Sequence, residues 1–76
     1  MDDMPPRVPE LPSQRVTDDM RRRLESGEWQ QNAALPPVAE LAASYGVSRT
    51  SVSRALKTLE QEGLIRIVSR WGTFKT

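Results

Sequence analysis

The sequence contains no cysteine and no histidine among its 76 residues. Without cysteine it can form no disulfide and no Cys-based zinc site. Without histidine it lacks the commonest general base and the commonest metal ligand, so a Ser-His-Asp triad is impossible within these residues. No glycine-rich phosphate loop is present either. We therefore expect no metal, no cofactor and no enzymatic activity.

Long apolar runs are also missing. No stretch approaches the roughly 18 apolar residues of a membrane span, and the N-terminus lacks the apolar core of a secretory signal. We expect a cytoplasmic protein without membrane contact. At 76 residues the chain forms one domain at most and buries only a modest core.

Charge is divided unevenly along the chain, although the net charge is only +1. Residues 1–47 carry five cationic and eight acidic side chains, whereas residues 48–76 carry six cationic and two acidic ones. This asymmetry indicates a C-terminal half that faces a polyanion. On charge alone, an ordinary solvated surface is an equally good interpretation.

Four prolines lie among charged residues in the segment 1–12, which predicts a flexible tail ahead of a folded domain over residues 13–76. Ser13 is a suitable N-cap for a first helix, and Gly27 a suitable end. Apolar residues recur every four positions along this helix and form one apolar stripe: Val16, Met20 and Leu24.

Charged residues of the first helix are expected to complement its dipole, with Asp18 and Asp19 near the start and residues 21–23, all arginine, towards the end. Three adjacent residues spread over a wide arc, so we interpret them as a solvated face. In the connector over residues 28–37, we expect Trp29 to join the core.

The centre of the chain predicts two helices joined by a short turn. The first runs from Val38 to Tyr45, where Gly46 permits the left-handed backbone of a sharp turn. Ser48 is a good N-cap for the second, which runs to about Glu62. This arrangement is typical of a helix-turn-helix.

The remainder predicts a β-hairpin. Residues 64–68 favour a strand, residues 69–72 a tight turn, and residues 73–75 a returning strand. A two-stranded hairpin is not stable alone, so it must pack on the helices. The expected fold is mainly α with a small β-hairpin, a three-helix winged helix-turn-helix.

The third predicted helix has an outward face of unusual composition. Its buried arc is Val52, Ala55, Leu56 and Leu59. The opposite arc has no large apolar residue and offers cations and hydroxyls: Thr50, Ser53, Arg54 and Lys57, with Arg49 at its margin. Guanidinium groups pair with guanine edges, and hydroxyls with phosphates or bases, when such a helix enters the major groove of DNA. The alternative is that residues 48–51 are simply a polar helix start.

The segment LPPVAELAASYGVSRTSVSRALKTLEQEGLI resembles the head of the GntR family of bacterial transcriptional regulators, which typically reads like LPSERELAxxYGVSRxTVRxALxxLExEGLI. The preceding SGEW and the closing GTF also match, so the resemblance covers about residues 14–75. It implies a winged helix-turn-helix that binds a palindromic operator as a dimer, most simply as a repressor. A small-molecule effector is implied only if a further domain follows this chain.

The resemblance also implies site residues. Ser48, Arg49, Thr50 and Ser51 would lie at the DNA contact, with Arg49 as the main base reader. The wing would approach the minor groove through Arg70, Trp71, Gly72 and Thr73. With Ser53, Arg54 and Lys57 of the outward arc, these form the predicted DNA interface.

Four positions depart from the family pattern. An arginine expected in the second helix is Ala39, and the one expected after the TV pair is Ser53, with Arg54 one place later. The wing Gly-Arg-Gly is Arg70-Trp71-Gly72. The Pro-Gly before LP is Gln31-Asn32, where asparagine tolerates the same backbone. These changes suggest that part of the DNA contact has moved to Arg54 and Arg70.

A rival function is contact with a protein through the same fold. Such a surface needs aromatic or leucine anchors on the third helix, which instead carries hydroxyls and cations. Trp71 in the wing is the one residue that favours this rival.

Overall fold

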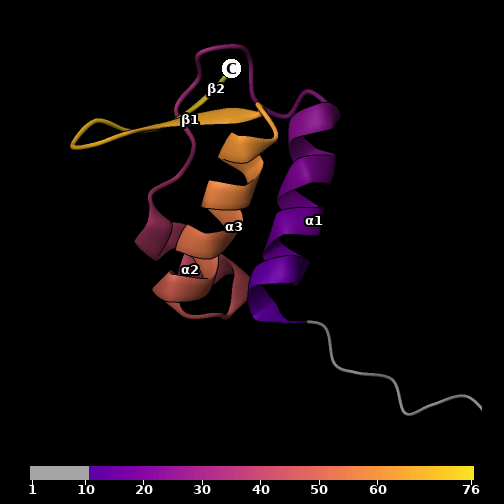
Figure 1. Ribbon diagram of the computed structural model, residues 1–76, viewed down its shortest axis with the longest axis vertical. Helices are drawn as coiled ribbons and strands as arrows, with labels where there is room; N and C mark the ends of the chain where they lie inside the picture. The colour runs from indigo at the N-terminus through magenta and orange to yellow at the C-terminus, as the bar shows by residue number, and fades with distance from the viewer. Residues whose placement is uncertain (1–10) are drawn as a thin grey trace, which may run out of the picture.

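The computed structural model describes residues 11–76, so the predicted tail falls largely outside the described residues. Three helices, α1 (Pro12–Glu25), α2 (Val38–Tyr45) and α3 (Arg49–Gln61), are followed by strands β1 (Ile65–Val68) and β2 (Gly72–Lys75). Helix α1 lies alongside α3, α2 packs at one end of α3, and the hairpin crosses the other end (Figure 1). None of the described helices is long and apolar enough to cross a membrane.

The start of α1 differs from the prediction. The residue before the helix is Leu11, whose backbone is extended and whose side chain makes no cap bond, and Pro12 occupies the first turn. Proline is preorganised for that position, so the helix begins before Ser13. Asp18 and Asp19 consequently lie in mid-helix, with no acid in the first turn. The basic residues of its last turn are Arg22 and Arg23, as predicted.

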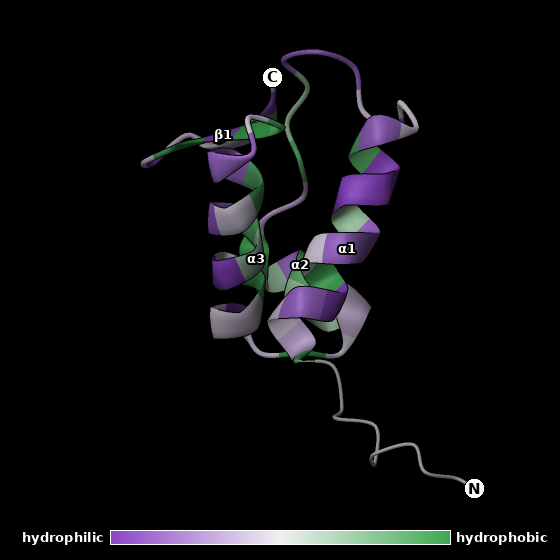
Figure 2. Cartoon of the chain, turned by 45° about the vertical axis from the view of Figure 1, so that its right-hand side comes forward, coloured by the Kyte–Doolittle hydropathy of each residue, from purple (hydrophilic) through white to green (hydrophobic). Residues whose placement is uncertain are grey.

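The core forms where the apolar stripes of the helices meet. Val16, Met20 and Leu24 of α1 are at most 2% exposed, which confirms the predicted stripe. Figure 2 shows the hydrophobic side of α3 turned towards the rest of the chain and its hydrophilic side turned away. The buried residues of α3 are those predicted, Val52, Ala55, Leu56 and Leu59. Trp29 is only partly buried, at the edge of this core.

The connector between α1 and α2 does more than join two helices. Leu35 N–H donates to the carbonyl of Thr73 at 2.8 Å, and Asn32 N–H donates to the carbonyl of Lys75 at 2.8 Å. An isolated bridge pairs Ala34 with Phe74. The connector therefore covers the outer edge of β2 through this bridge and its flanking hydrogen bonds, which supports the hairpin.

The backbone of Asn32 confirms one detail of the sequence comparison. Its φ is 69°, in the left-handed region where asparagine substitutes for glycine most readily. The hairpin itself is antiparallel, pairing Ile65 with Lys75 and Val68 with Gly72. The predicted three helices and hairpin are all present, and the fold is a winged helix-turn-helix.

Candidate nucleic-acid interface

The turn between α2 and α3 fixes how α3 is presented. Gly46 has a φ of 68°, and Val47 N–H donates to the carbonyl of Ala42 at 3.0 Å, which closes the end of α2. Ser48 then starts α3, because its hydroxyl oxygen accepts from Ser51 N–H at 3.1 Å. Both predicted signals are confirmed.

The cap also engages the side chain of Ser51. The Ser48 hydroxyl donates to the Ser51 hydroxyl at 3.1 Å, and Ser51 is partly buried. These two predicted DNA contacts therefore have a structural role first, which is to define where α3 begins. Arg49 follows directly and is exposed on the first turn.

The outward face of α3 is exposed as its sequence predicts. Its exposed residues include all five of those placed on the outward arc: Arg49, Thr50, Ser53, Arg54 and Lys57. They lie opposite the buried arc that packs on α1 and α2, so nothing in residues 11–76 covers them. The face presents cations over about two turns of the helix, from Arg49 to Lys57.

The cations of α1 are used within the protein. Arg21 binds Glu62 at 2.6 Å and Asp18 at 3.0 Å, and Arg22 binds Asp19 at 2.6 Å. The Glu62 carboxylate raises the pKa of Arg21, and the Arg21 guanidinium lowers the pKa of Glu62 in turn. The triple arginine is therefore a set of ion pairs on the surface, which the sequence did not reveal.

A second polar cluster joins α1 to α2. The Tyr45 hydroxyl donates to Asp19 Oδ2 at 2.6 Å and accepts from Arg23 Nη1 at 2.8 Å. Arg23 also binds Glu28 and lies 4.7 Å over the ring of Trp29. The Tyr45 hydroxyl is the main cause of the lowered pKa of Asp19, and burial is the main cause of the raised pKa of Tyr45.

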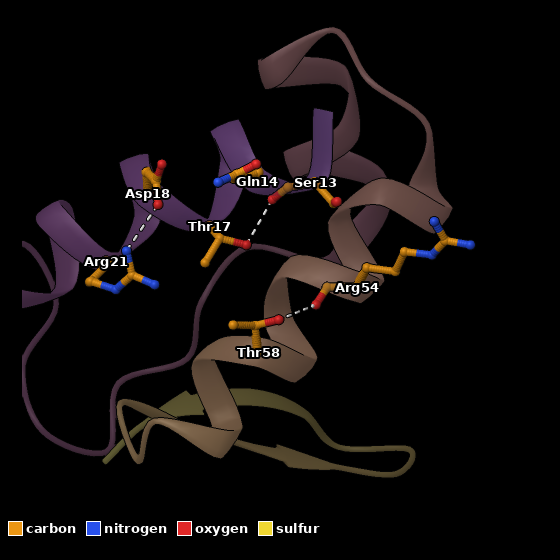
Figure 3. A pocket seen from close by; sticks show the side chains of 7 residues that line it. All are labelled: Ser13, Gln14, Thr17, Asp18, Arg21, Arg54 and Thr58. Atoms are coloured by element: carbon orange, nitrogen blue, oxygen red, sulfur yellow. Dashed lines mark hydrogen bonds and ion pairs between the residues drawn. The ribbon is translucent and has the colours of Figure 1, made fainter. Parts of the chain in front are cut away.

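The cations of α3 and the wing form a contrasting group. Over residues 11–76, every ion pair involves an arginine of α1, and none involves Arg49, Arg54, Lys57, Arg66 or Arg70. Arg54 borders a hollow of about 280 Å³ between α1 and α3. In the close view its side chain extends away from Asp18 and Arg21 (Figure 3). Within the described part of the chain, no acidic side chain pairs with Arg54.

The wing is held against α3 by its backbone. Ile67 N–H donates to the Glu60 carboxylate at 2.9 Å, and Ile65 is 2% exposed. The bond from Trp71 N–H to the Val68 carbonyl, 3.0 Å long, closes the turn at the tip. Sequence reasoning missed the role of Glu60, because its partner lies on another element.

Arg70 adopts a backbone that glycine would adopt more easily. Its φ is 73°, at the place where the family resemblance leads one to expect glycine. A side chain in this region costs about 1–2 kcal/mol per residue, yet the turn keeps an arginine there. Arg70, Trp71 and Gly72 are all exposed at the tip, which reaches beyond the helices (Figure 1).

Thr73 does not belong to this exposed set. It is 9% exposed, and it lines a groove of about 220 Å³ between the wing and α3, beside Leu56 and Ile67. Successive side chains of a strand point to opposite faces, and in β2 the exposed Gly72 is followed by the buried Thr73. The Thr73 side chain is thus used in packing between the wing and α3, and a DNA contact at Thr73 stays a prediction.

Three helices, a glycine turn and a hairpin whose cations form no ion pair within residues 11–76 define a winged helix-turn-helix of the nucleic-acid-binding type. Residues 12–74 match the family model described as "Bacterial regulatory proteins, gntR family". The chain belongs to the GntR family.

Relatives in sequence agree with this assignment. The chain is similar to the "Histidine utilization repressor" of Klebsiella aerogenes, at 36% identity over 80% of this chain and 25% of that protein. It is also similar to the "HTH-type transcriptional repressor NagR" of Bacillus subtilis, at 34% identity over 78% of this chain and 24% of that protein. The chain spans about a quarter of the length of these curated relatives.

Solved structures show the same fold. AraR(DBD) in complex with operator ORR3 superposes with a TM-score of 0.87, at 22% identity, covering 100% of this chain and 92% of that one. A GntR family transcriptional regulator from Listeria monocytogenes superposes with a TM-score of 0.82, at 24% identity, covering 100% of this chain and 62% of that one.

Proposed function

We propose that this chain binds double-stranded DNA sequence-specifically, as the DNA-reading domain of a transcriptional regulator that acts as a repressor. Helix α3 lies in the major groove and the wing lies at the minor groove of a palindromic operator. Two copies occupy the two half-sites, so a homodimer forms on DNA.

The separation of the cations carries this proposal. Acids within the protein neutralise Arg21, Arg22 and Arg23, whereas the exposed cations of α3 and the wing have no such partner in residues 11–76. A folded domain gains little from clustering unpaired like charges, so an external polyanion is the natural counter-charge. Duplex DNA is such a polyanion, and its major groove admits an α-helix.

Position along α3 assigns different tasks to its residues. Side chains near the N-terminal end of such a helix reach base edges, so Arg49 and Thr50 read sequence. Arg54 and Lys57 lie further along the exposed arc, where phosphates are closer, and they fix the register. Ser48, Ser51 and Ser53 contribute hydroxyls at the same surface, with Ser48 and Ser51 chiefly capping the helix. In the wing, Arg70 approaches the phosphates of the minor groove.

The names of the relatives support the regulatory part of the proposal. Two of the similar proteins are named repressors, and AraR(DBD) was crystallised with an operator. By the same comparison we propose that the chain has no enzymatic role and needs no cofactor. We also propose that it acts in the bacterial cytoplasm, associated with the nucleoid. A small-molecule effector would bind a separate domain.

Selection of duplexes from a randomised library tests the proposal. The chain should enrich duplexes that share one half-site sequence, measured by sequencing and then by titration. Arg49→Ala should abolish the enrichment. Arg22→Ala is the matched control, because it removes the same charge from an exposed position of α1 and should leave enrichment intact. Recovery of unrelated duplexes by the unaltered chain would refute sequence-specific binding.

A further inference from the structure

Trp71 is the most exposed large hydrophobic residue of the described chain. It is 78% exposed, against 65% for Leu11 and 39% for Ile67. The sequence has two tryptophans, and the other, Trp29, packs against the core beneath Arg23. A solvent-exposed indole at a hairpin tip does not stabilise the fold. Its exposure therefore indicates a binding partner that buries it.

The charges around Trp71 indicate the chemistry of that partner. Residues 63–76 carry Arg66, Arg70 and Lys75 and no acidic residue. Arg66 and Arg70 are exposed and, within residues 11–76, neither forms an ion pair. A protein partner that buries an apolar tip does not require positive charge around it. The minor groove of duplex DNA does, because it combines negatively charged phosphate walls with apolar sugar faces. The cationic setting therefore favours DNA.

The turn presents the indole rather than hiding it. The hydrogen bond from Trp71 N–H to the Val68 carbonyl fixes the residue at the tip, and Arg70 keeps a left-handed backbone beside it. In Figure 1 this tip projects past the helices, at the far end of the hairpin from the core. An exposed aromatic side chain on a fixed, projecting turn has the form of a wedge.

We infer that Trp71 enters the minor groove as an apolar wedge that unstacks a base step, so that the operator carries a deformable pyrimidine–purine step beneath the wing. This inference rests on the proposed function and adds a specificity-determining residue to it. Such steps kink at lower cost than others, so Trp71 selects sequence without a hydrogen bond to a base. Arg70 holds the adjacent phosphate.

Fluorescence measures insertion directly. In Trp29→Phe, Trp71 is the sole tryptophan, and its emission should be quenched and shielded from acrylamide when duplexes enriched by the unaltered chain are added. In the matched control Trp71→Phe, the emission of Trp29 should stay unchanged, because that ring packs on the core away from the tip.

Affinity measures the consequence for specificity. Replacing the pyrimidine–purine step under the wing by a stiff A-tract step should weaken binding of the unaltered chain about tenfold. Trp71→Ala should bind both duplexes alike, at the weaker level. Urea denaturation should show no loss of stability in Trp71→Ala, since the side chain is 78% exposed.

The possible failures are distinguishable. If no duplex is enriched, the proposed function fails and the inference falls with it. If duplexes are enriched but the emission of Trp71 and the step preference do not change, only the inference is overturned. If Trp71→Ala retains DNA affinity but abolishes self-association in sedimentation, Trp71 belongs to a protein contact and the inference is again wrong.

Discussion

Arg49 and Lys57 are two exposed cations on one helix face, and their positions predict different defects. Arg49 lies on the first turn of α3, where side chains reach base edges, whereas Lys57 lies two turns later. Arg49→Ala should cost about 1–3 kcal/mol on the selected duplex and much less on a scrambled one. Lys57→Ala should weaken binding to both duplexes about equally. Paired titrations of each variant against the two duplexes measure the difference.

Both variants should stay folded, because neither side chain lies on the buried arc of Val52, Leu56 and Leu59. Circular dichroism and urea denaturation provide that control. An equal loss on both duplexes for Arg49→Ala would make Arg49 a phosphate clamp. Specificity would then have to come from Thr50, Arg54 or the wing.

At the scale of elements, the junction between α2 and α3 depends on one backbone conformation. Gly46 has a φ of 68°, and a methyl group added there would meet nothing within 4 Å. The cost of Gly46→Ala is therefore conformational, about 1 kcal/mol after the smaller entropy of the unfolded alanine chain is allowed for. Urea denaturation should show this loss, and Gly46→Asn should lose less because asparagine tolerates the left-handed region. Equal losses for the two variants would show that the conformation of Gly46 is not what limits stability.

The junction between α1 and α2 should respond to pH. The Tyr45 hydroxyl lowers the pKa of Asp19 below its ordinary 3.8, with burial opposing and Arg22 adding to the effect. A carboxyl whose folded pKa is lowered stabilises the fold above its ordinary pKa, and this is lost as the pH falls through the lowered value. Tyr45→Phe should therefore destabilise the protein by about 1 kcal/mol at neutral pH and by less in acid.

Urea denaturation at neutral pH and below the pKa of Asp19 measures that difference. Glu28 and Glu62 also have lowered pKa values, because Arg23 and Arg21 donate to them. Glu62 lies away from the junction between α1 and α2, so its pH-dependent contribution to stability is the same in Tyr45→Phe and in the unaltered chain and cancels in the comparison. A destabilisation that is the same at both pH values would mean that Asp19 does not act through Tyr45.

At the scale of the whole molecule, local signals in the sequence predicted the fold well. The period of Val16, Met20 and Leu24, the glycine at position 46 and the serine at position 48 each act within one or two turns of chain. The left-handed Asn32 also follows from the local preference of its residue type. Signals of this kind need no knowledge of what packs against them.

Features that depend on distant parts of the chain were not predictable in this way. Arg21 meets Glu62 across 41 positions, and the connector pairs with β2 about 40 residues later, at Leu35 and Thr73. Burial of Thr73 depends on how the wing packs on α3, which no strand pattern of four residues specifies. Even the start of α1 was misplaced, because Ser13 and Pro12 compete for the same helix end and proline occupies the first turn.

The pattern of paired and unpaired cations, taken over the whole molecule, predicts a salt dependence. Counterions leave duplex DNA in proportion to the phosphates that a protein neutralises. Within residues 11–76, the exposed cations of α3 and the wing form no ion pair, whereas Arg21, Arg22 and Arg23 of α1 are paired with acids. The remaining cation of α1, Arg15, donates to the carbonyl of Tyr45. Affinity for the selected duplex should therefore fall with a log–log slope of about −3 to −5 per monomer.

Titrations from low to physiological salt measure this slope, and two substitutions divide it between the groups of cations. Lys57→Ala should flatten it by roughly one unit, because one phosphate contact is lost. Arg22→Ala should leave it unchanged, since Arg22 is already paired with Asp19. A slope near zero for the unaltered chain would contradict DNA binding itself. A flattening by Arg22→Ala equal to that by Lys57→Ala would instead place α1 on the DNA and make the assigned interface wrong.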